Sequence, residues 1–217
     1  EPICGDFLGR VMEKAVKMGE SNACMKRIVA APTAGACGVI PAVFLSYEEY
    51  CKETENRMVE ALFVSAGIGA VIAENASIAG ASGGCQAEIG SASAMAAGGL
   101  AYLQGGDAEC IANAAAFALK NMLGLTCDLV EVPCIKRNSA GAVNAAVSAQ
   151  MAMAGIKSAI PADEVVDSMR RIGNALPAAL RETSEGGLAV TESARKIAER
   201  MGKKEHIAKK TREGNEN

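Results

Sequence analysis

The sequence contains no tryptophan and a single histidine, and aromatic residues make up only 3% of its 217 residues. A core must therefore be built from alanine, valine, isoleucine, leucine and methionine, whose small or flexible side chains let helices approach closely. The shortage of aromatic rings and the formal net charge of −3 argue against a nucleic-acid partner, because such partners need basic surface. With one histidine, His206, in a charged C-terminal stretch, cysteine is the main candidate ligand for a metal.

No apolar run reaches the roughly 20 residues that a membrane span needs. The longest, ALFVSAGIGAVIA from Ala61 to Ala73, ends at Glu74 and Asn75, which predicts a buried core helix and no membrane contact. The opening stretch EPICGDFLGR has no initiator methionine and lacks the regions of a secretory signal. The eight cysteines are irregularly spaced, unlike a disulfide framework, so we expect a cytoplasmic protein with free thiols.

Helix-forming residues dominate and β-branched runs are short, which predicts an all-α fold. We expect a compact bundle of about nine helices, with cysteine-bearing loops converging at one end. The predicted helices cover residues 6–18, 38–50, 57–77, 88–103, 107–123, 139–154, 162–172, 175–182 and 188–200. Asp107 is the predicted N-cap of one of them, and Gly124 and Gly155 should follow helix ends. Residues 1–200 should form one helical domain, and the charged residues 201–217 a frayed tail.

One break in the helical pattern, GLTCDLVEVPCIKRN, holds Cys127 and Cys134 seven positions apart. Pro133 is expected to keep this loop from closing into a helix, and Asn138 to cap the helix that follows. Lys136 and Arg137 are either a solvated pair or a binding site for a carboxylate, which the arginine fork suits well.

The two helices predicted between Cys85 and Cys127 are nearly equal in length and are joined by the short stretch QGGD. Matched helices with a short connection are antiparallel neighbours, so Cys127 should return to the level of Cys85 with Cys134 in reach of both. Cys85 and Cys134 also precede predicted helix starts, where the helix dipole lowers a thiol pKa.

Three converging thiolates indicate iron-sulfur chemistry, or less readily zinc or Cu(I). Spacing alone favours a metal site no more than inert packing, since free cysteine is a common buried residue. Inert packing is the better interpretation of four of the others, Cys4, Cys24, Cys51 and Cys110, and Cys37 in a glycine-rich loop is intermediate. Glu88 is interpreted as a first-turn acid that complements the helix dipole.

Four stretches resemble the alpha chain of the iron-sulfur-dependent bacterial L-serine dehydratases (L-serine ammonia-lyases). They are NACMKRIVAAPTAGACGVIPAV, GGCQAEIGSASAMAAGGLAYLQGG, GLTCDLVEVPCIKRNSAGAVNA and LPAALRETSEGGLAVT. The resemblance implies that Cys85, Cys127 and Cys134 are the three protein ligands of a 4Fe-4S cluster. It also implies a helical catalytic domain that works with a beta chain, and we expect a homo-oligomeric assembly.

In this interpretation one iron has no protein ligand and acts as a Lewis acid on L-serine, so that water is lost and pyruvate and ammonia form. Candidate substrate-binding residues are Thr33, Lys136, Arg137 and Asn138. The catalytic base is left unassigned: a lysine, a tyrosine, a hydroxide on the cluster or a residue outside this chain could serve.

The sequence departs from the family pattern in three ways. We expect the family's leading segment, with its Ser/Gly/Thr/Gly-rich stretch, to be missing before EPICGDFLGR. Ala34 stands where an asparagine is frequent, and the C-terminal stretch has no cysteine to cap the open iron. Three alternatives therefore stay open: an iron-sulfur L-cysteine desulfidase, a structural protein with a metal-free site, and an electron-transfer or redox-sensing module.

Overall fold

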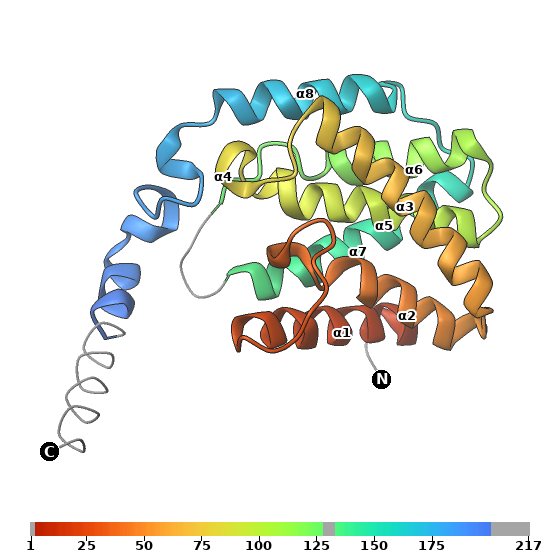
Figure 1. Ribbon diagram of the computed structural model, residues 1–217, viewed down its shortest axis with the longest axis horizontal. Helices are drawn as coiled ribbons and strands as arrows, with labels where there is room; N and C mark the ends of the chain where they lie inside the picture. Colours follow the sequence, from red (N-terminus) through yellow and green to blue (C-terminus); the bar gives the residue numbers. More distant parts are fainter. Residues whose placement is uncertain (1–2, 128–132, 201–217) are drawn as a thin grey trace, which may run out of the picture.

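The computed structural model describes residues 3–127 and 133–200, and these residues form helices joined by loops, with no strand among them (Figure 1). The all-α prediction is therefore confirmed. The predicted tail, residues 201–217, and the middle of the predicted loop, residues 128–132, lie outside the described residues. The main helices are α1 (Gly5–Ala23), α2 (Val39–Cys51), α3 (Glu55–Asn75), α5 (Ser91–Leu103), α6 (Ala108–Lys120), α7 (Pro133–Met153) and α8 (Ala162–Ala175).

Shorter helical turns connect or extend these helices. They are α4 (Gly80–Gly83), a π-helical turn (Gln86–Gly90), and the 3-10 turns η1 (Ala34–Ala36), η3 (Ala178–Leu180) and η4 (Gly187–Val190). A further helical segment covers residues 192–200. The π-helical turn runs directly into α5, so the helix predicted from residue 88 begins two residues earlier and in a wider form.

Helix α5 is the centre of the bundle, because it packs against α2, α3, α6 and α7. Nearly all of its side chains are buried, and most are alanine, glycine or serine. Small side chains let four neighbouring helices approach the same helix, as the composition predicts. Two buried hydroxyls add specific ties: Ser93 Oγ donates to the Gly141 carbonyl on α7 at 2.8 Å, and Ser65 Oγ on α3 donates to the Met95 carbonyl at 2.8 Å.

The remaining helices cover this centre on two sides. In Figure 1, α1 and α2 lie along the lower side next to α7, and α8 runs along the upper side over α4 and α6. Helix α8 carries its apolar residues on one face, where Val165, Val166 and Met169 are buried. The chain then leaves the bundle near α4, at the left end of Figure 1.

The prediction that α3 is a buried core helix is wrong for one of its faces. Ala61, Ser65 and Gly69 face α5 and are buried, but Leu62 and Phe63 are 49% and 74% exposed. In the described part of the chain, α3 is the one helix that could cross a membrane by length and apolar composition, and only 28% of its apolar window is buried. Length and composition alone are weak support for a membrane span, because core helices pass the same test.

The prediction of a helix over residues 175–182 is also wrong. Pro177 disfavours helical geometry at the residue before it, and Leu176 has ψ near 131°, so α8 ends at Ala175. Only the short turn η3 follows. The last predicted helix is confirmed in its second half, where the Thr191 hydroxyl accepts a hydrogen bond from the Ala194 amide at 3.3 Å and marks the start.

Two glycines inside helices give a matched test of close packing against α5. A Cβ at Gly99 would lie 2.6 Å from Ser65 Oγ and 3.1 Å from the Ala61 carbonyl, whereas one at Gly67 would meet nothing within 4 Å. Overpacking costs about 1–3 kcal/mol and outweighs the helix propensity that alanine adds. We therefore expect Gly99→Ala to destabilise the protein by about 1–2 kcal/mol and Gly67→Ala to stabilise it by roughly 0.5–1 kcal/mol. Urea unfolding of both variants measures these changes in the free energy of unfolding. Equal changes in the two variants would contradict the close approach of α3 and α5.

Candidate functional site

The α5 and α6 pair brings two distant cysteine segments together, as the sequence predicts. Asp107 caps α6 by accepting a hydrogen bond from the Cys110 amide at 2.8 Å, and the connection from α5 is short. At the opposite ends of the two helices, the Gln86 amide donates to the Leu125 carbonyl at 3.0 Å. The helices are therefore antiparallel, and the Cys127 segment returns to the level of Cys85.

The glycine before Cys85 is required by this close approach. Gly84 has φ of +74°, and a Cβ on it would lie 2.9 Å from both the Leu125 carbonyl oxygen and Leu176 Cδ1. A residue with a side chain would be strained there and would push the two segments apart. The Gly-Gly-Cys sequence is thus explained by the backbone contact beside the cysteine.

Gln86 holds the same junction from the inside and was not predicted as a site residue. Its side chain is fully buried, its Oε1 accepts from the Gly124 amide at 2.9 Å, and its Nε2 donates to the Met169 carbonyl on α8 at 3.0 Å. The signal in the sequence was a polar amide directly after Cys85 in an otherwise apolar stretch, because a buried amide needs fixed partners.

The three predicted ligands, Cys85, Cys127 and Cys134, lie close enough to change one another's pKa values. Cys127 lowers the pKa of the Cys85 thiol by hydrogen bonding to it, and this effect outweighs burial. The same hydrogen bond, joined by burial, raises the pKa of Cys127. Burial raises the pKa of Cys134, with the charge of Cys127 adding to it. The helix-terminus argument alone predicted a lower pKa for Cys134, and burial is the reason that it fails.

The two basic residues predicted for the site differ in position. Arg137 Nη1 donates to the Thr126 carbonyl at 2.7 Å, and the guanidinium charge lowers the pKa of Cys85, though less than Cys127 does. Arg137 therefore connects the first turns of α7 to the segment that carries Cys127. Lys136 is exposed at the same end of the helix.

Pro133 and Asn138 do not play the local roles predicted for them. Pro133 is the first residue of α7 and does not exclude helix from the segment, because its missing amide and fixed φ suit the first position of a helix. Asn138 lies in the second turn and is no N-cap. Its Nδ2 donates to the Cys134 carbonyl at 2.6 Å and to the Gly35 carbonyl at 2.8 Å, and its Oδ1 accepts from the Gly38 amide at 2.7 Å.

This fully buried amide connects the Cys134 turn to the loop that carries Thr33. Both donor hydrogens of the amide are used by backbone carbonyls. Asn138 therefore positions two parts of the site relative to each other. Its predicted contact with substrate stays a prediction.

Thr33 borders a half-buried carboxyl, that of Glu88 on the π-helical turn. Burial raises the pKa of Glu88, the nearby charge of Glu182 adds to this, and the Thr33 hydroxyl acts in the opposite direction. The Thr33 Oγ1 atom is itself buried and makes no hydrogen bond of good geometry to a described residue. π-helical turns are frequent at functional sites, so the position of Glu88 goes beyond that of a first-turn acid.

The RETSEGG stretch lies at this site and was not assigned a role from the sequence. The Cys127 amide donates to the Leu180 carbonyl at 2.9 Å, and Glu182 follows with a left-handed φ of +52°. Arg181 fixes the segment through hydrogen bonds to the carbonyls of Ser82, Asn174 and Leu176. Its presence among the four resembling stretches was the signal that could have pointed to it.

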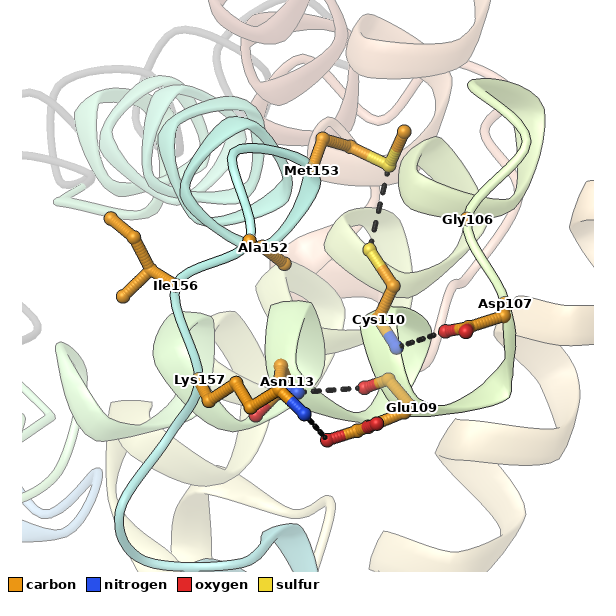
Figure 2. A pocket seen from close by; sticks show the side chains of 10 residues that line it. Gly106, Asp107, Glu109, Cys110, Asn113, Ala152, Met153, Ile156 and Lys157 are labelled. Carbon is orange, nitrogen blue, oxygen red and sulfur yellow. Dashed lines mark hydrogen bonds and ion pairs between the residues drawn. The ribbon is translucent and has the colours of Figure 1, made fainter.

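The other cysteines lie away from this group. Cys37 is fully buried, its thiol approaches the Met18 carbonyl at 3.8 Å, and burial raises its pKa. Cys110 lies at the start of α6, where its Sγ approaches Met153 Sδ at 3.4 Å beside an open pocket of about 370 Å³ (Figure 2). Cys4, Cys24 and Cys51 are exposed, and all eight cysteines are free thiols.

The three site thiols are soft donors of the kind that iron-sulfur clusters use. Among the described residues, no three His, Cys, Asp or Glu side chains are arranged around one metal position. In an iron-sulfur cluster each thiolate binds a different iron, so the ligands need not converge on one point. Buried soft donors with a guanidinium nearby fit such an anionic cluster.

Comparison with known proteins gives consistent matches. A family model described as serine dehydratase alpha chain matches residues 1–189. "Probable L-serine dehydratase, alpha chain" of Bacillus subtilis is 49% identical over 203 residues, 92% of this chain and 68% of that protein. "L-serine dehydratase, alpha chain" of Peptoniphilus asaccharolyticus is 47% identical over 90% of this chain and 68% of its own length. "L-serine dehydratase 1" of Escherichia coli is 43% identical over 81% of this chain, which spans only 40% of that longer protein.

Proposed function

The chain belongs to the serine dehydratase alpha chain family, and on this premise we propose that it is an L-serine ammonia-lyase that forms pyruvate and ammonia from L-serine. The observation that carries the proposal is the grouping of Cys85, Cys127 and Cys134 at one end of the bundle. This grouping brings together cysteines from three segments of the chain through the packing of α5 with α6 and α7.

We assign these three thiols as ligands of a 4Fe-4S cluster. Three protein ligands for four irons leave one iron open, and when bound the cluster would supply a Lewis acid for the hydroxyl and carboxylate groups of the substrate. Cys127 and Arg137 both lower the pKa of Cys85, which favours the thiolate form that a metal binds. Cys127 and Cys134 need the metal to displace their protons, since their pKa values are raised.

The remaining residues of the site prepare it for an amino acid. Arg137 uses one donor for the Thr126 carbonyl and has others left for a carboxylate, which guanidinium groups bind in a forked geometry. Lys136 adds positive charge at the rim, and the buried Thr33 hydroxyl beside Glu88 is a further polar group for the substrate. Asn138 is a positioning residue, because its hydrogen bonds hold the loop of Thr33 and the turn of Cys134 at a fixed distance from each other.

A beta chain is the proposed partner, since three of the relatives are named as alpha chains. The exposed apolar face of α3 is compatible with assembly into a larger enzyme, including a homo-oligomer. Eight free thiols favour a reducing compartment, so we place the protein in the cytoplasm.

Anaerobic reconstitution of the chain with iron and sulfide, in the presence of its beta chain, tests the proposal. We expect the brown absorption of a cluster, stoichiometric iron and sulfide, and pyruvate from L-serine. L-cysteine is the competing substrate, because a desulfidase would release sulfide and pyruvate from it. If the enzyme forms pyruvate from L-cysteine and none from L-serine, it is an L-cysteine desulfidase. If the reconstituted protein binds no iron, the proposed iron-sulfur mechanism is wrong.

A further inference from the structure

The Glu88 carboxyl occupies a space that two glycines leave open. A Cβ added at Gly35 would lie 2.9 Å from Glu88 Oε2, and one added at Gly80 would lie 3.0 Å from the same oxygen. The carboxyl therefore sits between the loop that carries Thr33 and the start of α4. Both glycines belong to stretches that border the three thiols, so the carboxyl faces the site.

The charges around Glu88 link it to the thiols and to a second carboxylate. Its charge acts on Cys134 and raises the pKa of that thiol. A Cβ at Gly80 would also meet Glu182 Oε1, which places the two glutamates beside each other. Among the ion pairs of the described residues, none involves either glutamate. No described basic side chain therefore neutralises the charge of Glu88, and its hydrogen-bonding neighbours are the Thr33 hydroxyl and the Gly80 backbone.

The tyrosines of the described chain, which are alternative bases, lie away from the site. The Tyr47 hydroxyl approaches the Leu103 carbonyl at 3.4 Å, and Tyr102 donates to Glu60, both at the C-terminal end of α5. Helix α5 has 13 residues and spans about 20 Å, and the thiols lie at its other end. Tyr50 packs against the Phe7 ring on the outer part of α2. None of the three tyrosines therefore lies inside the site, and Lys136 is exposed at its rim.

We propose that Glu88 is the catalytic base that removes the α-proton of L-serine, an inference that rests on the proposed function. The Cα–H electron pair forms the Cα=Cβ double bond, the Cβ–O bond breaks, and hydroxide leaves with its electron pair. The proton held by Glu88 combines with this hydroxide as water, so the carboxylate is regenerated. Aminoacrylate then tautomerises to the imine, which takes up water and gives pyruvate and ammonia.

The location of Glu88 suits this step. A half-buried carboxyl next to a like charge holds a proton more tightly than a solvated one, which brings its pKa closer to the pH at which the protein works. The π-helical turn sets its direction, because the wider turn rotates residue 88 relative to a regular helix that starts at Cys85.

The test compares Glu88→Gln and Glu88→Asp in the anaerobically reconstituted full enzyme. Loss of a positioned base lowers rates by about 10²–10⁴-fold, so we expect kcat of Glu88→Gln to fall by roughly that factor with KM little changed. Glu88→Asp keeps a carboxylate and should recover part of the loss. Iron content should equal that of the wild type, and L-serine should still perturb the absorption spectrum of the cluster, since binding does not need the base.

A second substrate separates proton removal from help to the leaving group. β-Chloro-L-alanine loses the same α-proton but needs no acid for the departure of chloride, and we expect Glu88→Gln to lose activity on it to a similar extent. Glu20→Gln, on the exposed face of α1, is the matched control and should keep full activity.

Three outcomes would count against the inference. A Glu88→Gln enzyme within tenfold of wild-type kcat would show that another group removes the proton. Loss of iron in both variants would give Glu88 a structural role instead. A reconstituted wild type that does not turn over L-serine would overturn the proposed function itself, and the two failures are distinguished by this measurement.

Discussion

Replacing Cys127 by serine is expected to prevent binding of the proposed 4Fe-4S cluster and, with it, pyruvate formation from L-serine. Cys127 is buried, its thiol lies close enough to Cys85 to lower the pKa of that thiol, and its amide donates to the Leu180 carbonyl, so its backbone has a fixed position. A serine hydroxyl is a hard and weakly acidic ligand that binds iron poorly. Mutation of residues that only support metal ligands lowers metal affinity or activity 10–100-fold. Replacing the ligand itself should therefore lower iron affinity and activity by more than ~100-fold.

Iron and sulfide analysis after anaerobic reconstitution measures this effect directly. Cys110→Ser is the matched control, because Cys110 is a free thiol of the same chain that contacts Met153 away from the site. The control should bind the full complement of iron and keep its activity. A Cys127→Ser protein with a complete and stable cluster would contradict the assignment of ligands.

Replacing Asn138 by alanine is expected to destabilise the fold and to loosen the site together. The side chain is fully buried and its three hydrogen bonds all go to backbone groups of other turns. An unpaired buried polar group costs about 1–3 kcal/mol, and water can satisfy some of the three, so we expect a loss of about 3 kcal/mol. Urea unfolding of the metal-free protein measures it.

Asn75→Ala is the matched control, since Asn75 is exposed at the end of α3 and bonds only to the Val71 carbonyl of its own helix. It should change stability by less than about 0.5 kcal/mol. In the cluster-loaded enzyme, Asn138→Ala should also weaken iron binding by roughly 10-fold or more, because Cys134 loses its link to the Gly35 turn. Unchanged stability with a large rise in KM for L-serine would instead support direct contact between Asn138 and the substrate.

The sequence predicted those parts of the fold that depend on local pattern. Helix periodicity, the Asp107 cap and the glycine at position 155 are determined by neighbouring residues, and each is confirmed. The Gly155 amide bonds to the Ala152 carbonyl and the Ile156 amide to the Met151 carbonyl, the two hydrogen bonds of a glycine-terminated helix end. The return of Cys127 to Cys85 also followed from local information, because a short turn between helices of equal length leaves few alternatives.

The sequence could not predict the features that depend on tertiary contacts. Proline disfavours the interior of a helix but is favoured at its first position. The sequence does not show where α7 begins, so it could not predict that Pro133 is the first residue of that helix. Asn138 has the composition of a cap, yet its partners lie about 100 residues earlier in the chain. Glu88 was equally ambiguous, since its neighbours at Gly35 and Gly80 come from separate loops.

The antiparallel α5 and α6 pair determines when the site can be assembled. Its contacts are local in sequence, and local contacts form early in folding because little chain entropy is lost in closing them. Cys85 and Cys127 are therefore brought together by polypeptide alone, with the buried alanine-rich face of α5 as the driving force. If the proposed cluster is present, its insertion would then act on a chain that already holds two of the three thiols side by side.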